Sequence, residues 1–354
     1  METLKINETP VRTSRNFHIN NIKLDNLDIP NCVDIFENVE IRDESSKINF
    51  EEINTDINLV YGLGDVLTSN VRNNSNKNLK ITVESKVNKE LEIDFGFNKD
   101  NLNLIDNIEI EANENSKGTI IIKYKSEDDT VNFHNGVIKL RAKKDSKVNV
   151  IVVNLLNSNS NNFIAIQNEF EENAKANYTV IDFGGKTSIS NYYSDLKGKE
   201  ANDQINTIYL GNGAQVFDLN YIAELRGEKT DINIEVQGAL NDTAKKHFKG
   251  TIDFKKGCKK ATGNENESCM LLSDKAKSLA LPMLLCSEED VEGNHSSSAG
   301  KIGDKELFYI MSRGFDQKEA MKLMVRAKFN NILENIKNEE LKNEIIEEIN
   351  KKLD

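Results

Sequence analysis

The sequence predicts a mainly β protein whose core is a β-solenoid. From about residue 79 to 285, short apolar or alternating runs follow one another, separated by polar or Gly-containing turns. No helix-period stretch interrupts them, which excludes a sheet of βαβ units, because parallel strands of that kind need helical crossovers. A sandwich, a barrel and a solenoid remain open on these observations.

A recurring turn favours the solenoid among these three folds. Several turns place a small residue just before the next strand, as in ENAKANYTV, GKEANDQINTIYL and GNGAQVFDL. A repeating unit of this kind is typical of coils that stack on one another, although the repeat here is irregular.

The two ends of the chain differ from this core. Residues 1–75 mix short apolar clusters with polar spacers and are predicted to form a small N-terminal region, with the turn-rich NVRNNSNKN (70–78) as its boundary. The β core is expected over 76–312. Residues 313–354 are predicted to form two amphipathic helices, the first opened by the capping pair Asp316 and Glu319. The expected apolar stripes are Ala320, Leu323, Met324 and Ala327 in the first helix, and Leu341, Ile345, Ile349 and Leu353 in the second.

Composition limits the class of partner and the compartment. Acidic residues number 58 against 46 basic ones, and the net charge of −12 is a poor match for the phosphates of nucleic acid. No apolar run approaches the roughly 20 residues that cross a bilayer. The start, METLKINETPVRTSRNF, lacks the apolar core of a signal peptide. We therefore expect a cytoplasmic protein that binds neither nucleic acid nor membrane.

Motifs of common enzymes are missing, so the sequence gives little support to a hydrolase or a metalloprotease. GGKT (184–187) lacks the upstream glycine of a phosphate-binding loop, and neither G-x-S-x-G nor H-E-x-x-H occurs. The four cysteines, Cys32, Cys258, Cys269 and Cys286, form no CxxC pair and are expected to be reduced thiols. The last three are expected to be small buried residues.

The segment EEDVEGNHSSSAGKIGDKELFYIMSRGF (288–315) holds a histidine in an unusual setting. His295 lies between an acidic run and a small-residue stretch, in an expected turn, ahead of a strand-like LFY that we expect to be buried. Neutral imidazole is a common metal ligand. A histidine bonded to a loop carbonyl explains these residues equally well.

Residues 270–325, from MLLSDKAKSLALPMLLCSEEDVEGNH to SRGFDQKEAMKLMV, resemble the C-terminal signature of the SufB/SufD family of iron-sulfur cluster assembly proteins. Further family segments resemble, in the order in which they occur along this chain, GLGDV, GGKTSISNYYSDLKGKEANDQINTIYLGNGAQVFDL and KKHFKGTIDF. PVRTSRNFHINNIKLD resembles a family segment near the start, but without the tryptophans of that segment.

The resemblance implies a right-handed parallel β-helix flanked by helical ends. It also implies a scaffold subunit, not an enzyme, that pairs with a SufB-like paralogue and with a SufC-like ABC-type ATPase. The ATPase would engage the C-terminal helical segment, where the expected partner-binding residues are Arg313, Gly314, Phe315, Ala320, Leu323 and Met324.

The same resemblance places the chain closer to SufD than to SufB. Ala276 and Ser296 stand where the SufB branch has a cysteine and a glutamate, and Gly293 where some SufD proteins have a cysteine. His295 matches the shared histidine and is implied to be an iron or cluster ligand at the subunit interface, with Cys286 as a second candidate. Iron or a cluster would be held transiently and shared with the partner. The alternatives are a SufB-like member and a drifted homodimeric β-solenoid that binds partners without a metal role.

Overall fold

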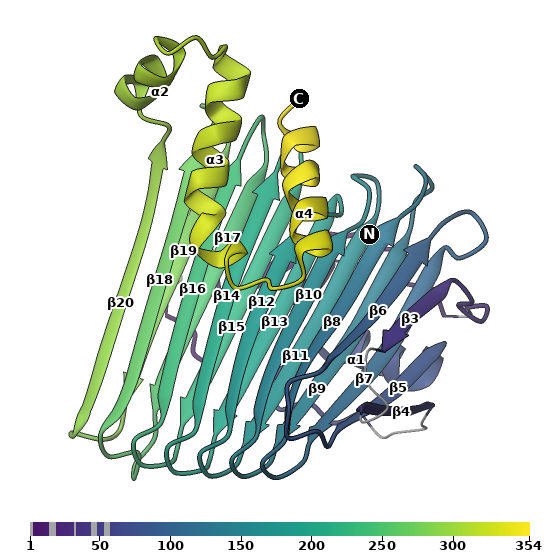
Figure 1. The fold of residues 1–354 in the computed structure, drawn as a ribbon, viewed down its shortest axis with the longest axis vertical. Coiled ribbons are helices and arrows are strands. Elements are labelled where there is room, and N and C mark those ends of the chain that lie inside the picture. Colours follow the sequence, from purple (N-terminus) through teal and green to yellow (C-terminus); the bar gives the residue numbers. More distant parts are fainter. Residues whose placement is uncertain (1–2, 14–18, 32, 44–47, 53–56) are drawn as a thin grey trace.

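The computed structural model describes residues 3–13, 19–31, 33–43, 48–52 and 57–354, with the side chains of 48–52 excepted. Two nine-stranded sheets face each other, and from Lys77 onward successive strands of the chain alternate between them, so that the core is a parallel β-solenoid (Figure 1). The predicted fold class is confirmed. Cys32 and His18, as well as the middle of PVRTSRNFHINNIKLD, lie outside the described residues.

Each coil of the solenoid contributes one strand to each sheet. Within the sheets the strands are parallel, except that β3 and β4 pair antiparallel with β6 and β5. The first sheet contains β3 (Val39–Asp43), β6 (Glu90–Phe97), β8 (Lys117–Ser126), β10 (Lys147–Leu155), β12 (Lys175–Asp182), β14 (Asn202–Gly211), β16 (Asp231–Leu240), β18 (Ala261–Leu271) and β20 (Val291–Lys301). The second contains β4 (Ile48–Glu52), β5 (Lys77–Val83), β7 (Asn103–Ala112), β9 (Phe133–Ala142), β11 (Asn161–Phe170), β13 (Thr187–Leu196), β15 (Val216–Leu225), β17 (Lys245–Phe254) and β19 (Lys277–Cys286).

The turns explain the repeat seen in the sequence. Asn173 and Glu200 adopt positive φ angles of 53° and 60° and reverse the chain. The next residues, Ala174 and Ala201, are fully buried between the sheets. A larger side chain would not fit at this entry point, so a small residue recurs just ahead of several strands.

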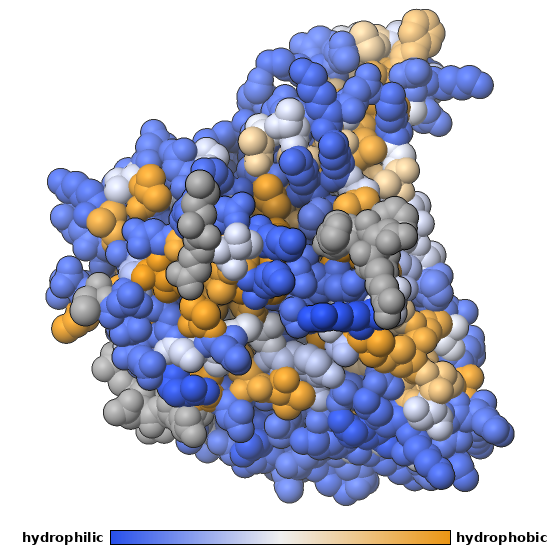
Figure 2. Space-filling view, turned by 180° about the vertical axis from the view of Figure 1, so that it is seen from behind, coloured by the Kyte–Doolittle hydropathy of each residue, from blue (hydrophilic) through white to orange (hydrophobic). Residues whose placement is uncertain are grey.

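The N-terminal region lies against the second sheet. β1 (Thr3–Ile6) and β2 (Ile22–Asp25) pair antiparallel, and α1 (Asp65–Asn74) packs on β7 and β9. Asn7 is buried and donates hydrogen bonds to the carbonyl of Ser190 at 3.0 Å and to Oδ1 of Asp218 at 2.6 Å. The expected boundary turn at 70–78 is wrong in part, because α1 extends through Asn74. Figure 2 shows this side of the molecule as mainly hydrophilic, with separate hydrophobic patches.

Three helices follow the last strand: α2 (Asp304–Met311), α3 (Gln317–Leu333) and α4 (Glu339–Lys352). α3 and α4 lie on the outer face of the first sheet, whereas α2 projects beyond it (Figure 1). The capping pair is confirmed, since the Glu319 amide donates to Oδ1 of Asp316 at 2.9 Å and the Asp316 amide to Oε2 of Glu319 at 3.0 Å. The predicted stripe of the second helix is buried.

The two helices predicted for 313–354 are found as α3 and α4. Other predictions around them need correction. A further helix, α2, precedes them within the residues expected to be β core, because LFY belongs to α2 and not to a strand. These residues are not buried: Phe308 is 74% exposed. The face of α3 that packs on the sheet is formed by Val325, Phe329, Ile332 and Leu333, while Leu323 and Ala327 are exposed.

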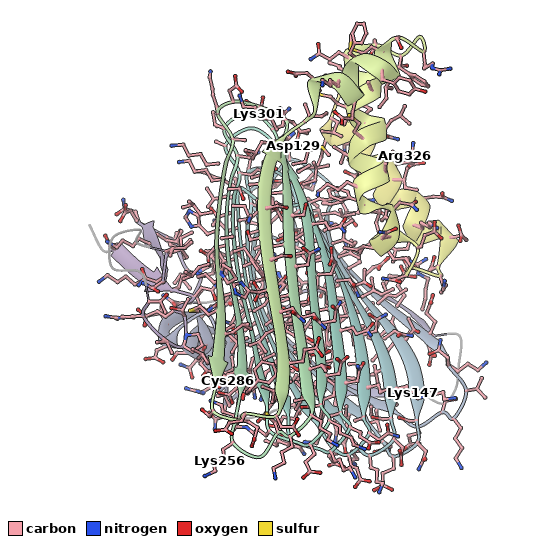
Figure 3. All side chains as sticks on the ribbon, turned by 90° about the vertical axis from the view of Figure 1, so that its left-hand side faces the viewer. Asp129, Lys147, Lys256, Cys286, Lys301 and Arg326 are labelled. Carbon is pink, nitrogen blue, oxygen red and sulfur yellow. The ribbon has the colours of Figure 1, made fainter. Side chains whose placement is uncertain are left out.

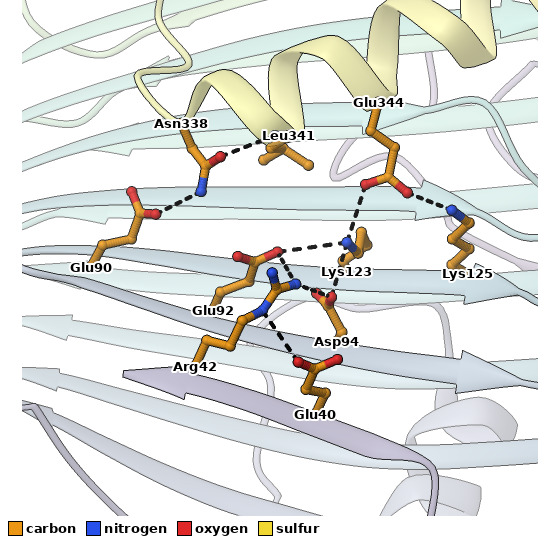
Figure 4. Close-up of polar contacts among 10 residues, drawn as sticks. All are labelled: Glu40, Arg42, Glu90, Glu92, Asp94, Lys123, Lys125, Asn338, Leu341 and Glu344. Atoms are coloured by element: carbon orange, nitrogen blue, oxygen red, sulfur yellow. Dashed lines mark hydrogen bonds and ion pairs between the residues drawn. The ribbon is translucent and has the colours of Figure 1, made fainter. Parts of the chain in front are cut away.

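An ion-pair network joins α4 to the sheet (Figure 4). Lys123 of β8 lies 3.1 Å from Glu344 of α4 and 2.9 Å from Asp94 of β6, and Arg42 of β3 lies 2.6 Å from the same Asp94. Burial alone would lower the pKa of Lys123, but Asp94 and Glu344 outweigh it and raise that pKa. The network therefore keeps Lys123 charged and couples the C-terminal helix to three neighbouring strands. None of the described helices is long and apolar enough to cross a membrane.

Candidate functional site: the open end of the solenoid

The C-terminal end of the solenoid is uncapped. β20 pairs with β18 along one edge and β19 pairs with β17, and no described strand pairs with their other edges. Figure 3 looks onto this end, where Cys286 and Lys301 lie at opposite ends of the terminal coil. An exposed edge strand presents unpaired backbone N–H and C=O groups, which are a template for another chain. We call β19 and β20 the open coil.

His295 lies in the middle of β20, in register with Glu265 of β18. Side chains in register on neighbouring parallel strands project from the same face of a sheet. Glu265 is buried between the two sheets, so His295 is on the inner face of the open coil. The expectation that NHSSSAG forms a turn is wrong, because the whole segment belongs to β20.

Glu265 has an unusual environment for a carboxylate. It is 2% exposed, and neither carboxylate oxygen has a hydrogen-bond partner. A Cβ atom on Gly250 of β17 would lie 2.2 Å from its Oε2, so the carboxylate occupies a recess that exists only because residue 250 is glycine. Burial and, second, the charge of Glu267 raise the pKa of Glu265 to about 8.

The neighbouring carboxylate, Glu267, is fully satisfied. Its Oε1 accepts from Nζ of Lys246 at 2.6 Å and from the hydroxyl of Tyr209 at 3.3 Å. Its Oε2 accepts from the hydroxyl of Ser297 at 2.9 Å. Glu267 therefore has its own buried counter-ion, and Glu265 does not share it.

Cys286 is placed apart from His295. It pairs in register with Phe254, whereas the Glu265 carboxylate lies against Gly250, four residues earlier on β17. At about 3.3 Å per residue this is a separation of roughly 13 Å along the strands. Cys286 is exposed, which corrects the expectation that it is a small buried residue, and its thiol donates to the carbonyl of Glu288 at 2.9 Å.

Cys258 and Cys269 are buried, as expected, and burial raises the pKa of each thiol, that of Cys258 to about 11. Neither is an activated nucleophile, because a raised pKa leaves little thiolate at neutral pH.

Among the described residues, no three His, Cys, Asp or Glu side chains converge on a point that could hold a metal ion. A ligand set centred on His295 thus needs donors beyond those that the described residues bring together.

A second candidate surface is the tip formed by α2 and the start of α3. Phe308, Tyr309, Met311 and Phe315 are exposed there, and the Arg313 guanidinium lies 5.0 Å from the Tyr309 ring centroid. Figure 2 shows hydrophobic side chains on this projecting end. We call this surface the apolar tip. Its two aromatic residues in α2 were missed from the sequence, because an apolar LFY is ordinarily assigned to a core.

The remaining predicted partner-binding residues differ in how far their side chains are exposed. Gly314 reverses the chain between α2 and α3 with a φ of 101°. Leu323 is 37% exposed and Met324 is half-buried. Ala320 is fully buried, so its side chain is not part of an exposed surface.

Residues 95–328 match the family described as SUF system FeS cluster assembly, SufBD core domain. The chain is 27% identical over 166 residues to the iron-sulfur cluster assembly protein SufD of Bacillus subtilis, covering 47% of this chain and 38% of that protein. It is 31% identical over 159 residues to a SufBD family protein of Pyrococcus horikoshii, covering 44% and 34%. A SufBD family protein of Staphylococcus saprophyticus is 22% identical over 196 residues, covering 55% and 42%.

These matches span less than half the length of each of these relatives. The strands of this chain, including those of the final coil, form one continuous solenoid. The matched core runs from β6 into α3 and includes the open coil. The chain therefore belongs to the SufB/SufD family of the SUF system for iron-sulfur cluster assembly.

Proposed function

We propose that this protein is a SufD-like scaffold subunit, without catalytic activity of its own, that supports iron-sulfur cluster assembly in the cytoplasm. The observation that carries the proposal is the open coil, which exposes a strand edge and presents His295 on its inner face. Iron or a cluster would be bound transiently, because no three donor side chains converge in the part of the chain that the structure describes.

The open coil fits a SufB-like paralogue as partner. A second solenoid can continue both sheets by pairing with the free edges of β19 and β20, which satisfies their backbone groups. The sequence of β20, VEGNHSSSAGK, has small side chains and no proline, so that a neighbouring strand can approach. Cysteines on such a partner would then face His295 across the shared end.

The apolar tip fits the ABC-type ATPase. Phe308 and Tyr309 are 74% and 58% exposed, and exposed aromatic residues clustered with an arginine are typical of binding hot spots. The tip is joined to the solenoid through α3, which packs on the first sheet directly after it. Movement of a bound ATPase would therefore be passed to the sheet that ends in the open coil.

Co-expression with a SufC-like ATPase and a SufB-like paralogue tests this proposal. We expect all three chains to elute together in size exclusion, and Phe308→Asp to weaken ATPase binding roughly tenfold or more while the paralogue stays bound. Val87→Asp is the matched control, because Val87 is 65% exposed at a distant turn. Separate elution of the three chains contradicts the complex, and a self-associated chain alone supports the homodimeric alternative.

Replacing His295 by alanine tests the role of the inner face. Iron and acid-labile sulfide bound by the purified complex are expected to fall by roughly tenfold, a loss typical of metal sites that lack a coordinating or supporting residue. Asn294→Ala is the control, since Asn294 is the adjacent residue and bonds to Asn264 on the outer face. Equal iron content in His295→Ala and Asn294→Ala would assign His295 a structural role only.

A further inference from the structure

We propose that Glu265 and His295 form a two-ligand half-site for a divalent transition-metal ion inside the open coil. The proposal deepens the proposed function and rests on it, because it names a second donor of this chain to the iron handled there. The site is incomplete in one chain, and its remaining positions face the open edge.

The first argument is the unpaired carboxylate. Burying a carboxyl group without a hydrogen-bond partner costs free energy in either protonation state, and such groups ordinarily have partners. Glu265 has none on either oxygen, although donors stand close by on Lys246 and Ser297, where Glu267 takes both. The protein thus satisfies one of two neighbouring carboxylates and leaves the other available.

The second argument is the shape of the recess. Gly250 has no side chain where the Glu265 carboxylate lies, and any other residue there would displace the carboxylate. In register with Gly250 on the open coil is Pro282, which has no polar side-chain atom. The residue of β19 that faces this position therefore offers no donor that would compete for the Glu265 carboxylate.

The third argument is the pairing of the two donors. Glu265 and His295 are register partners, and strands in a sheet lie about 4.8 Å apart, a spacing at which two side chains on one face can bind one ion. Among the described residues the His295 ring has no hydrogen bond or ion pair. One carboxylate with one imidazole suits iron(II), cobalt(II) or zinc, and favours them over calcium or magnesium, which take oxygen ligands.

Anaerobic titration of the purified full chain with cobalt(II), followed by calorimetry and by visible absorption, tests the half-site. We expect one bound ion per chain, and a loss of affinity of about tenfold or more in Glu265→Gln and in His295→Ala. The double variant is expected to lose no more than either single variant, because both side chains would bind the same ion. Glu292→Gln and Asn294→Ala are controls on the same strand.

Thermal unfolding with and without cobalt(II) distinguishes a variant that has lost the metal ligand from one that fails to fold. The ion is expected to raise the unfolding temperature of the wild type and of both controls, but not of Glu265→Gln. Unchanged cobalt(II) affinity in Glu265→Gln, additive losses in the double variant, or no binding by the wild type would each overturn the half-site. None of these results depends on complex formation. If the complex assembles but Glu265→Gln binds cobalt(II) normally, only the half-site is disproved. If the chain binds the metal ion but forms no complex, only the scaffold role is disproved.

Discussion

Phe329→Ala is expected to lower the free energy of unfolding by roughly 3–5 kcal/mol, the usual cost of removing a buried phenylalanine side chain. Phe329 is fully buried between α3 and the first sheet, and its ring stacks on Phe183 with centroids 6.3 Å apart. Its cluster contains the residues that hold both C-terminal helices on the solenoid. The alanine variant leaves a cavity at the centre of this contact.

Urea unfolding measures the loss, and amide hydrogen exchange locates it. Faster exchange is expected in α3 and α4, with the strands β10 to β18 still protected. Leu323→Ala is the control, because Leu323 belongs to the same helix but is 37% exposed. Equal destabilisation by both variants would contradict the view that one face of α3 carries the docking energy.

Gly198→Ala is expected to destabilise the solenoid by about 3 kcal/mol or more, at the upper end of the cost of overpacking. Gly198 lies in the turn between β13 and β14, and a Cβ atom there would be 2.1 Å from the carbonyl carbon of Glu171 in the previous coil. The contact is with backbone, so no side chain can rotate away from it. Gly227 repeats the contact one coil later, with a Cβ position 2.3 Å from the Gly198 oxygen.

The matched control is Gly300→Ala in β20, where a Cβ atom meets nothing within 4 Å. Urea unfolding of both variants gives the comparison. A Gly198→Ala protein as stable as Gly300→Ala would mean that the coils can separate at this turn without cost, contrary to their close backbone stacking.

Most of the solenoid is predictable from the sequence because local patterns determine it. Strands between β5 and β19 carry β-type apolar runs, since nearly every strand is covered on both edges and packs on an inner core. Small residues such as Ala174 and Ala201, which are buried at the ends of turns, indicate where the turns lie. The stripe of α4 at Leu341 and Ile345 has the helical period that an amphipathic surface helix requires.

The exceptions lie where a neighbouring element is missing. β20 lacks the apolar alternation of a buried strand because it has one paired edge and no coil beyond it, so its sequence resembles a turn. α2 carries Phe308 and Tyr309 without a core to receive them, so its sequence resembles a buried strand. Both departures coincide with the two surfaces that we assign to partners, as expected where function overrides the local rules of folding.

By itself, the sequence determined the solenoid, the helical C-terminus and the family, because periodicity, turn residues and motif spacing are local properties of the chain. Tertiary structure alone decided that Glu265 and His295, thirty residues apart, stand side by side, because strand register depends on how each coil stacks on the last. It alone also decided that the Glu265 carboxylate is buried against Gly250 without a partner, and that Cys286 stands apart from His295. Those are contacts between coils, and no local pattern of residues records them.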